Sequence, residues 1–150
     1  MASTIRLYFP SKIQSELSSH LTNEQTHYLK DVMRLKIGDK LSVFNALGEW
    51  KAIIQSYEKN GAKIKIMEKI RDEDNDKNIW LAFSPIKQNP LNFLIQKGTE
   101  LGVQRFIPIL SERTVVREIN IERITKIIIE ASEQSNRISV PKINKPELLK

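Results

Sequence analysis

The sequence predicts a protein of two domains, a small antiparallel β-barrel with one helix followed by an α/β region with parallel strands. Short β-rich runs fill residues 40–70, whereas a continuous apolar run and two segments of helical spacing fill residues 79–131. Between them, residues 71–78 are wholly polar and have no apolar period, which is typical of an exposed connector. We therefore expect domains at residues 1–70 and 79–150, joined by a linker at residues 71–78.

The first domain opens with a strand and a helix. Residues 5–9 have the composition of a short strand, which Pro10 stops. Thr22 and Gln25 have the spacing of a capping box, in which each side chain bonds the other residue's backbone amide, so a helix should begin there. The residues then expected to share one helical face are Tyr28, Leu29, Val32 and Met33.

An antiparallel meander follows this helix. Residues 41–44, 50–57 and 62–67 are short β-rich runs, and the last of them alternates lysines with apolar side chains. The connections suit tight turns, because Gly48 and the pair Asn60-Gly61 accept the backbone angles that a hairpin needs. These strands and the helix predict the small β-barrel.

The second domain begins with the run Ile-Trp-Leu-Ala-Phe at residues 79–83, which is typical of a strand buried on both faces. Asn89 and Pro90 then supply an N-cap and a proline for the first helical position. Gly102 is expected to end this helix. The inward positions recur at helical spacing, and they are Leu91, Leu94, Ile95, Gly98 and Leu101.

Residues 103–110 predict a second strand, in which Pro108 removes one ladder donor and so favours an edge or strand-end location. Asn120 is expected to cap a second helix. The buried stripe of that helix would be Ile121, Ile124, Ile127, Ile128 and Ala131. Strand, helix, strand and helix in this order predict the beginning of a right-handed parallel α/β unit.

The bulk composition favours a polyanionic partner and excludes several kinds of site. A net charge of +6 and a pI near 9.5 suit nucleic acid, since lysine and arginine release counterions when they meet phosphates. Without cysteine there is no disulfide, thiolate metal site or thiol nucleophile. His20 and His27 are lone histidines, so no metal site is expected. No run suits a signal peptide or a membrane span, which favours a soluble cytoplasmic protein.

The motifs point to one family. The sequence contains no Walker loop, dinucleotide-binding glycine motif or Gly-x-Ser-x-Gly turn. Two polar blocks stand out instead, QKGTELGV at residues 96–103 and EASEQSNRISVP at residues 130–141. Together with Lys87, SERTVV at residues 111–116 and HYLKDVMRLKIGD at residues 27–39, they resemble the RsmE family, the small-subunit (16S) ribosomal RNA uracil-N3 methyltransferases of the SPOUT superfamily.

The resemblance implies a PUA-like β-barrel that holds ribosomal RNA, then the first half of a SPOUT-type α/β methyltransferase domain. It implies methyl transfer from S-adenosylmethionine to N3 of a uridine in 16S ribosomal RNA, by a homodimer. The family's GPEGG loop and later LG-x-x-ILR-x-ETA segment, which bind S-adenosylmethionine and form a trefoil knot, have no counterpart in the 150 residues. This implies that the chain alone has no cofactor-binding residue and does not methylate.

The resemblance also implies roles for individual residues, although it does not identify the general base. The residues implied to bind RNA are Arg6, Arg34, Lys36, Lys87 and Lys97. The catalytic candidates are Arg113, Gln134 and Arg137. Purely local roles are open to some of them, because Lys97 and Glu100 have the spacing of a surface ion pair, and Asn136 before Arg137 suits the end of a helix.

Two functions of other classes stay open at the level of sequence. A non-catalytic RNA-binding module would use its α/β part only for self-association, and its affinity for RNA would fall steeply with added salt. An assembly factor would contact ribosomal protein instead and would depend little on salt. Without the knotted half through which the family dimerises, residues 79–83 and 121–129 are expected to expose apolar surface, so that the chain aggregates or forms a dimer unlike that of the family.

Overall fold

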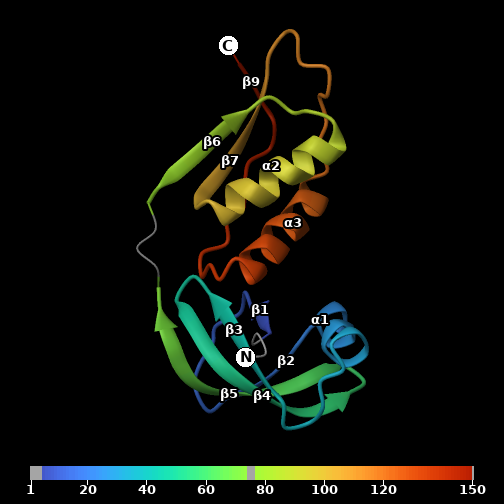
Figure 1. Cartoon of the computed structure of the whole chain (residues 1–150), viewed down its shortest axis with the longest axis vertical. Helices are drawn as coiled ribbons and strands as arrows, with labels where there is room; N and C mark the ends of the chain where they lie inside the picture. The colour runs from blue at the N-terminus through green and yellow to red at the C-terminus, as the bar shows by residue number, and fades with distance from the viewer. Residues whose placement is uncertain (1–4, 74–76, 150) are drawn as a thin grey trace. The chain divides into compact units, whose positions relative to one another are not determined.

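The computed structural model describes residues 5–73 and 77–149, so residues 74–76 of the expected linker lie outside the described residues. The chain divides into two compact units, Met1–Glu73 and Asp74–Lys150 (Figure 1). Each unit has its own sheet and its own hydrophobic core. Across the described residues, no helix has the length and apolar character to cross a membrane.

The first unit is built on one five-stranded sheet with the order β1-β3-β4-β5-β2. Its strands are β1 (Arg6–Tyr8), β2 (Ser18–His20), β3 (Lys40–Asn45), β4 (Gly48–Glu58) and β5 (Gly61–Asp72). The expected meander of β3, β4 and β5 is antiparallel as predicted. The last strand runs to Asp72, so the first residues of the expected linker belong to β5.

The barrel differs from the prediction at its edges. β1 pairs with β3 in parallel, and β1 and β2 stand at opposite ends of the strand order, so the sheet of the described residues is neither wholly antiparallel nor closed by hydrogen bonds. Each edge strand has only three residues, which limits the ladder it can form. β2 was not predicted, because Ser-Ser-His carries neither apolar alternation nor β-branched residues.

The helix of the first unit begins as predicted and then widens. α1 (Asn23–His27) has the expected capping box between Thr22 and Gln25. It continues as one π-helical turn, η1 (Tyr28–Val32), in which only Leu29 is buried. The expected helical face therefore does not form a buried stripe, because the wider turn changes the angle between successive side chains.

The second unit has a parallel sheet with two helices. Its elements are β6 (Ile79–Phe83), α2 (Gln88–Glu100), β7 (Val103–Leu110), α3 (Ile121–Gln134), β8 (Lys142–Ile143) and β9 (Glu147–Leu148). β7 is central and pairs in parallel with β6, β8 and β9. α2 and α3 share one core with the sheet and lie side by side in Figure 1.

One prediction about these strands was wrong, and a second holds in part. β6 is not buried on both faces, since it is an edge strand whose Trp80 is 55% exposed. Pro108 lies in the central strand rather than at an edge, but it lies near the end of that strand, which is the other location that was predicted. The carbonyl of Phe106 accepts from the Asn144 amide after β8, and the carbonyl of Leu110 accepts from the Leu149 amide after β9. Pro108 lies between these two carbonyls and faces the gap between β8 and β9, so its missing amide hydrogen costs no hydrogen bond of the sheet.

The helix ends follow local chemistry with one correction. Asn120 accepts from the Arg123 amide at 2.9 Å and caps α3, as predicted. α2 starts earlier than predicted, with Lys87 at its N-cap, so Pro90 lies inside the first turn, where a missing amide donor breaks no helical bond. Gly102, at φ +101°, ends α2 as predicted.

Gly98 shows why a small residue stands in α2. A Cβ atom at this position would lie 2.8 Å from Cε1 of the buried Phe106, so glycine lets the helix approach β7 closely.

Candidate functional site

The two polar blocks of the second unit meet through one arginine. Residues 96–103 form the end of α2 and the turn into β7, and residues 130–141 form the end of α3 and the connection to β8. Nη1 of Arg137 donates to the carbonyl oxygens of Thr99 and Val103, each at 2.8 Å. Nη2 donates to Ser139 Oγ, also at 2.8 Å. Arg137 therefore ties the two blocks together.

Arg137 is buried, with 8% of its surface exposed. A helix leaves its last carbonyls without intrahelical partners, and the guanidinium satisfies one of them together with the carbonyl that starts β7. Asn136, at φ +63°, makes the left-handed turn that was predicted for it. The guanidinium of this catalytic candidate is thus engaged inside the second unit.

The buried hydroxyls of the same blocks are also used internally. Thr99 Oγ1 donates to the carbonyl of Ile95, and Ser132 Oγ donates to the carbonyl of Ile128, each at 2.8 Å. Both residues have 0% exposed surface. Within the described ranges, Ser135 Oγ is a buried side-chain polar atom without a hydrogen-bond partner. The buried hydroxyls of Thr99 and Ser132 therefore have structural roles.

Lys97 and Gln134 differ from Arg137 because they reach the surface. Nζ of Lys97 lies 2.7 Å from Glu100 Oε2 and 5.8 Å from the centre of the Phe93 ring. The pKa of Glu100 lies below its usual value, mainly because Lys97 donates a hydrogen bond to the carboxylate. This is the surface ion pair that the spacing suggested. Gln134 is the exposed last residue of α3.

Lys87 and Arg113 follow the carboxyl ends of the two neighbouring parallel strands. Phe83, the last residue of β6, pairs with Pro108 near the end of β7, so the two connections leave the same edge of the sheet (Figure 1). Lys87 is exposed at the start of α2. In open parallel sheets this edge is where ligands bind.

A short turn presents Arg113. The hydroxyl of Thr114 accepts from the Ser111 amide at 2.8 Å, and the Thr114 amide donates to the Ser111 carbonyl at 3.2 Å. Thr114 is 9% exposed and anchors the turn, while Arg113 is exposed. The structure thus brings Lys87 and Arg113 to one edge. Lys97, Gln134 and Arg137 belong to the opposite end, near the start of β7.

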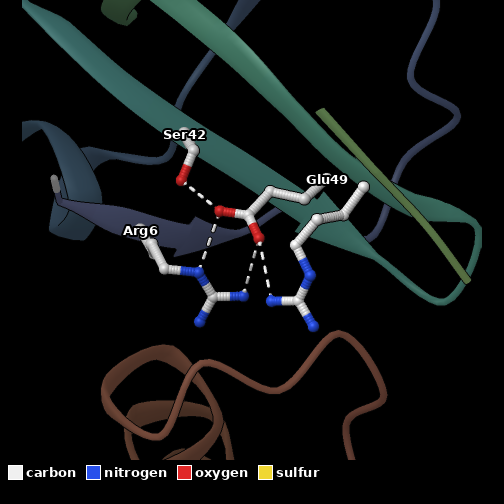
Figure 2. Close-up of polar contacts among 4 residues, drawn as sticks. Arg6, Ser42 and Glu49 are labelled. Carbon is white, nitrogen blue, oxygen red and sulfur yellow. Dashed lines mark hydrogen bonds and ion pairs between the residues drawn. The ribbon is translucent and has the colours of Figure 1, made fainter. Parts of the chain in front are cut away.

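Arg6 lies in a buried network of the first unit (Figure 2). Its Nε donates to Glu49 Oε1 at 2.9 Å and its Nη2 to Oε2 at 3.2 Å. Its guanidinium carbon lies 4.4 Å from the centre of the Phe44 ring. The side chain is 10% exposed. A residue expected to hold RNA is therefore engaged with a carboxylate inside the fold.

Glu49 is the centre of this network and was not singled out by its sequence. Ser42 Oγ donates to Oε1 at 2.5 Å, and Arg71 Nη1 lies 3.4 Å from Oε2. Burial raises the pKa of Glu49, but hydrogen bonds from Arg6 and Ser42 and the charges of Arg6 and Arg71 outweigh it, so the pKa lies below its usual value. A glutamate beside a turn gives no sequence signal of burial.

Arg34 and Lys36 remain exposed cations of the first unit. Both follow η1, and Arg34 has the left-handed angle φ +56°. In the part of the chain that the structure describes, neither side chain makes an ion pair. The described residues also hold no group of three histidine, aspartate or glutamate side chains placed to bind a metal.

Comparisons with known proteins match both units. Residues 73–150 match the family model described as an RNA methyltransferase domain, and residues 21–67 match the one described as an RNA methyltransferase PUA domain. The fold is accordingly a PUA-like β-rich region followed by a SPOUT-type α/β region with parallel strands.

Relatives agree over nearly the whole chain. Ribosomal RNA small subunit methyltransferase E of Rickettsia conorii is 36% identical over 142 residues, which cover 93% of this chain and 58% of the relative. The Bacillus subtilis protein of the same name is 33% identical and covers 88% and 55%.

A solved structure agrees as well. The ribosomal RNA small subunit methyltransferase E of Neisseria gonorrhoeae, bound to S-adenosylmethionine, superposes with a TM-score of 0.85 at 28% identity, covering 97% of this chain and 63% of that one. The chain thus spans less than two thirds of the length of each of these three proteins. With one family model covering residues 73–150 and a second covering most of the first unit, the chain belongs to the RsmE family of ribosomal RNA small subunit methyltransferases.

Proposed function

We propose that the complete protein is a cytoplasmic homodimer that transfers a methyl group from S-adenosylmethionine to N3 of a uridine in 16S ribosomal RNA. In this proposal the 150 residues hold the RNA and form one wall of the active site. The observation that carries it is the pair of exposed cations, Lys87 and Arg113, at the carboxyl edge of the parallel sheet in a chain of this family.

The chemistry explains what these cations would do. N3 of uracil carries a proton at neutral pH and is a weak nucleophile, so the enzyme must remove or polarise that proton while the base is unpaired or flipped out. Negative charge then develops on the uracil ring, and a fixed guanidinium such as that of Arg113 would stabilise it. Gln134 lies at the opposite end of the sheet from Arg113 and is left out of this wall, and Arg137 acts as a positioning residue for the turn into β7.

S-adenosylmethionine would supply the methyl group, but the residues present do not fit this cofactor. The Arg137 donors and the hydroxyls of Thr99 and Ser132 already bond within the second unit. Ser135 Oγ alone offers too few polar contacts for a cofactor of this size. We therefore assign cofactor binding to residues of the complete enzyme outside these 150, and we propose that the 150 residues alone neither bind it nor methylate.

The first unit would grip RNA by phosphate contacts. Arg34 and Lys36 supply exposed cations there. In the second unit Lys87 is exposed, and Lys97 is partly exposed and paired with Glu100. Such contacts fix the position of the RNA without reading its sequence. Arg6 is left out of this proposed set, because its guanidinium is held by Glu49.

A chimera tests the proposal. The 150 residues are joined to the part of the Rickettsia conorii relative that lies beyond the matched region, and methyl transfer from labelled S-adenosylmethionine to unmodified small ribosomal subunits is measured. We expect the chimera to produce 3-methyluridine and the Arg113→Ala chimera to lose at least about tenfold in rate, the usual scale for removing one transition-state contact. The intact relative is the positive control, and the 150 residues alone should bind no cofactor in calorimetry.

Other outcomes separate the alternatives. A chimera that binds S-adenosylmethionine and RNA but transfers no methyl group would favour the non-catalytic RNA-binding module. Clear cofactor binding by the 150 residues alone would contradict the assignment of that site to the remaining residues.

A further inference from the structure

The turn that follows α1 exposes a cluster of large apolar side chains. Leu29 fills the core and is 0% exposed, so this segment is firmly docked on the sheet. The apolar side chains that it turns to solvent are Tyr28, Val32, Met33 and Ile37, which are 40%, 58%, 42% and 65% exposed. Four such side chains within ten residues exceed the single, scattered apolar residues that are normal on a protein surface.

The backbone of this turn is unusual at two positions. The Met33 amide donates to the Tyr28 carbonyl at 2.9 Å in the π-helical turn, a geometry that is frequent at functional sites. Arg34 then adopts φ +56° and lets the Leu35 amide bond the Leu29 carbonyl at 2.9 Å. Glycine normally takes this left-handed position at the end of a helix, so an arginine there is strained. Strain of this kind is kept where the side chain is needed.

Hydrogen bonds hold the turn in one conformation. Tyr57 Oη donates to the Leu35 carbonyl at 2.8 Å, and the Lys36 amide donates to Asp39 Oδ2 at 2.7 Å. The Gly38 amide donates to the Ile54 carbonyl at 2.9 Å. The exposed side chains therefore stand on a fixed backbone, which lowers the entropy lost when a ligand binds.

The charges around the apolar cluster favour a polyanion. The cations of this turn are Lys30, Arg34 and Lys36, and the carboxylates are Asp31 and Asp39. Asp31 is engaged by His27 Nδ1 at 2.7 Å, and Asp39 by the Lys36 amide. The exposed apolar side chains suit the bases of a single-stranded nucleic acid, and the cations, which form no ion pair with a described carboxylate, suit its phosphates.

We propose that residues 28–37 bind an unpaired nucleotide of RNA, with the base against Tyr28 and Met33 and the phosphate at Arg34 and Lys36. The proposal rests on the proposed function, in that RNA is the substrate. It adds that the first unit distinguishes single-stranded from paired RNA next to the target. Base stacking on tyrosine requires an unstacked base, whereas a paired helix offers only phosphates and the groove edges.

Fluorescence anisotropy with the 150-residue chain tests this. The probes are an unstructured twelve-nucleotide RNA and the same RNA annealed to its complement. We expect Tyr28→Ala to weaken single-strand binding by at least about fivefold, the lower range for loss of one stacked base, and to change duplex binding less than about twofold. The matched controls are Leu47→Ala and Lys59→Ala, which remove an exposed apolar and an exposed basic side chain elsewhere in the first unit.

Arg34→Gly separates binding from folding. Glycine relieves the left-handed strain, so this variant should melt at a higher temperature than the wild type while it binds the single strand more weakly. A variant that merely misfolds would have both a lower melting temperature and a lower affinity for the single strand. Unchanged affinity for the single strand in both Tyr28→Ala and Arg34→Gly would overturn the proposal. Tyr28→Leu keeps the bulk of the side chain but removes its aromatic face. Wild-type affinity in this variant would also overturn the proposal and would point to a protein partner.

The methylation chimera keeps the two proposals distinct. If the chimera transfers no methyl group while the chain still prefers single strands through Tyr28, the proposed function fails and the nucleotide site stands. If the chimera methylates normally with Tyr28→Ala and the chain shows no strand preference, the nucleotide site fails alone.

Discussion

Replacing Arg137 with alanine is expected to lower the free energy of unfolding of the second unit by about 2 kcal/mol or more, because two buried carbonyls lose a charged donor at roughly 1–3 kcal/mol each, while the Thr99 carbonyl keeps the Gly102 amide as a donor. The loss should stay within the second unit, since every hydrogen-bond partner shown for this guanidinium lies there. Arg137→Lys should recover only part of the stability, because one ammonium group does not reproduce the planar fork.

Amide hydrogen exchange read by NMR checks this result unit by unit. Amides of α3 and β7 should lose protection in Arg137→Ala, while those of β4 keep it. Gln134→Ala is the matched control, since an exposed substitution three residues earlier should change stability by only about 0.5 kcal/mol or less. Full protection of α3 in Arg137→Ala, together with weakened RNA binding, would show instead that Arg137 is a direct ligand.

Replacing Glu49 should have a similar effect on the first unit. Glu49→Gln leaves the guanidinium of Arg6 buried without its counter-charge, and breaking a buried pair in this way typically costs about 3–5 kcal/mol. Chemical unfolding followed by the fluorescence of the buried Trp50 measures it. Glu68→Gln is the control, because that carboxylate pairs with Lys51 at the surface and should contribute little.

Acid should act on the same network. The pKa of Glu49 is lower in the folded than in the unfolded chain, so the unfolded state takes up the proton first as pH falls. The stabilisation is therefore complete above the ordinary pKa of a glutamate and is lost as pH falls through the depressed value. Glu49→Gln should flatten this acid dependence. If the stability of the wild-type first unit did not change between neutral pH and pH values below the pKa of Glu49, the proposed stabilising role of this network would be contradicted.

Local signals explain what the sequence predicted of the fold. The capping box at Thr22, the Asn120 cap and the Gly102 terminus each depend on a few neighbouring residues, and all three are present. Failures came where tertiary structure decides. The apolar run of β6 has the composition of a buried strand, yet its position at the sheet edge leaves Trp80 exposed. The place of Pro108 depended on where two short strands end.

Tertiary structure also decides which of the candidate site residues are buried and which are exposed. Arg6 and Glu49 are 43 positions apart, and nothing near either one indicates that they pair. Arg137 follows a helix, where an exposed cation is the ordinary expectation, and only the fold shows that it returns to the end of α2. The predicted order of strands and helices, by contrast, agrees with the structure, in which Lys87 and Arg113 follow neighbouring parallel strands.

The most direct test asks which arginines meet RNA. NMR spectra of the arginine Nε–H groups are recorded as single-stranded RNA is added to the 150-residue chain. We predict that the signals of Arg34 and Arg113 move with added RNA, while those of Arg6 and Arg137, held by Glu49 and by the end of α2, stay in place. Large shifts at Arg6 and Arg137 with none at Arg34 and Arg113 would contradict the division between exposed RNA contacts and buried structural clamps.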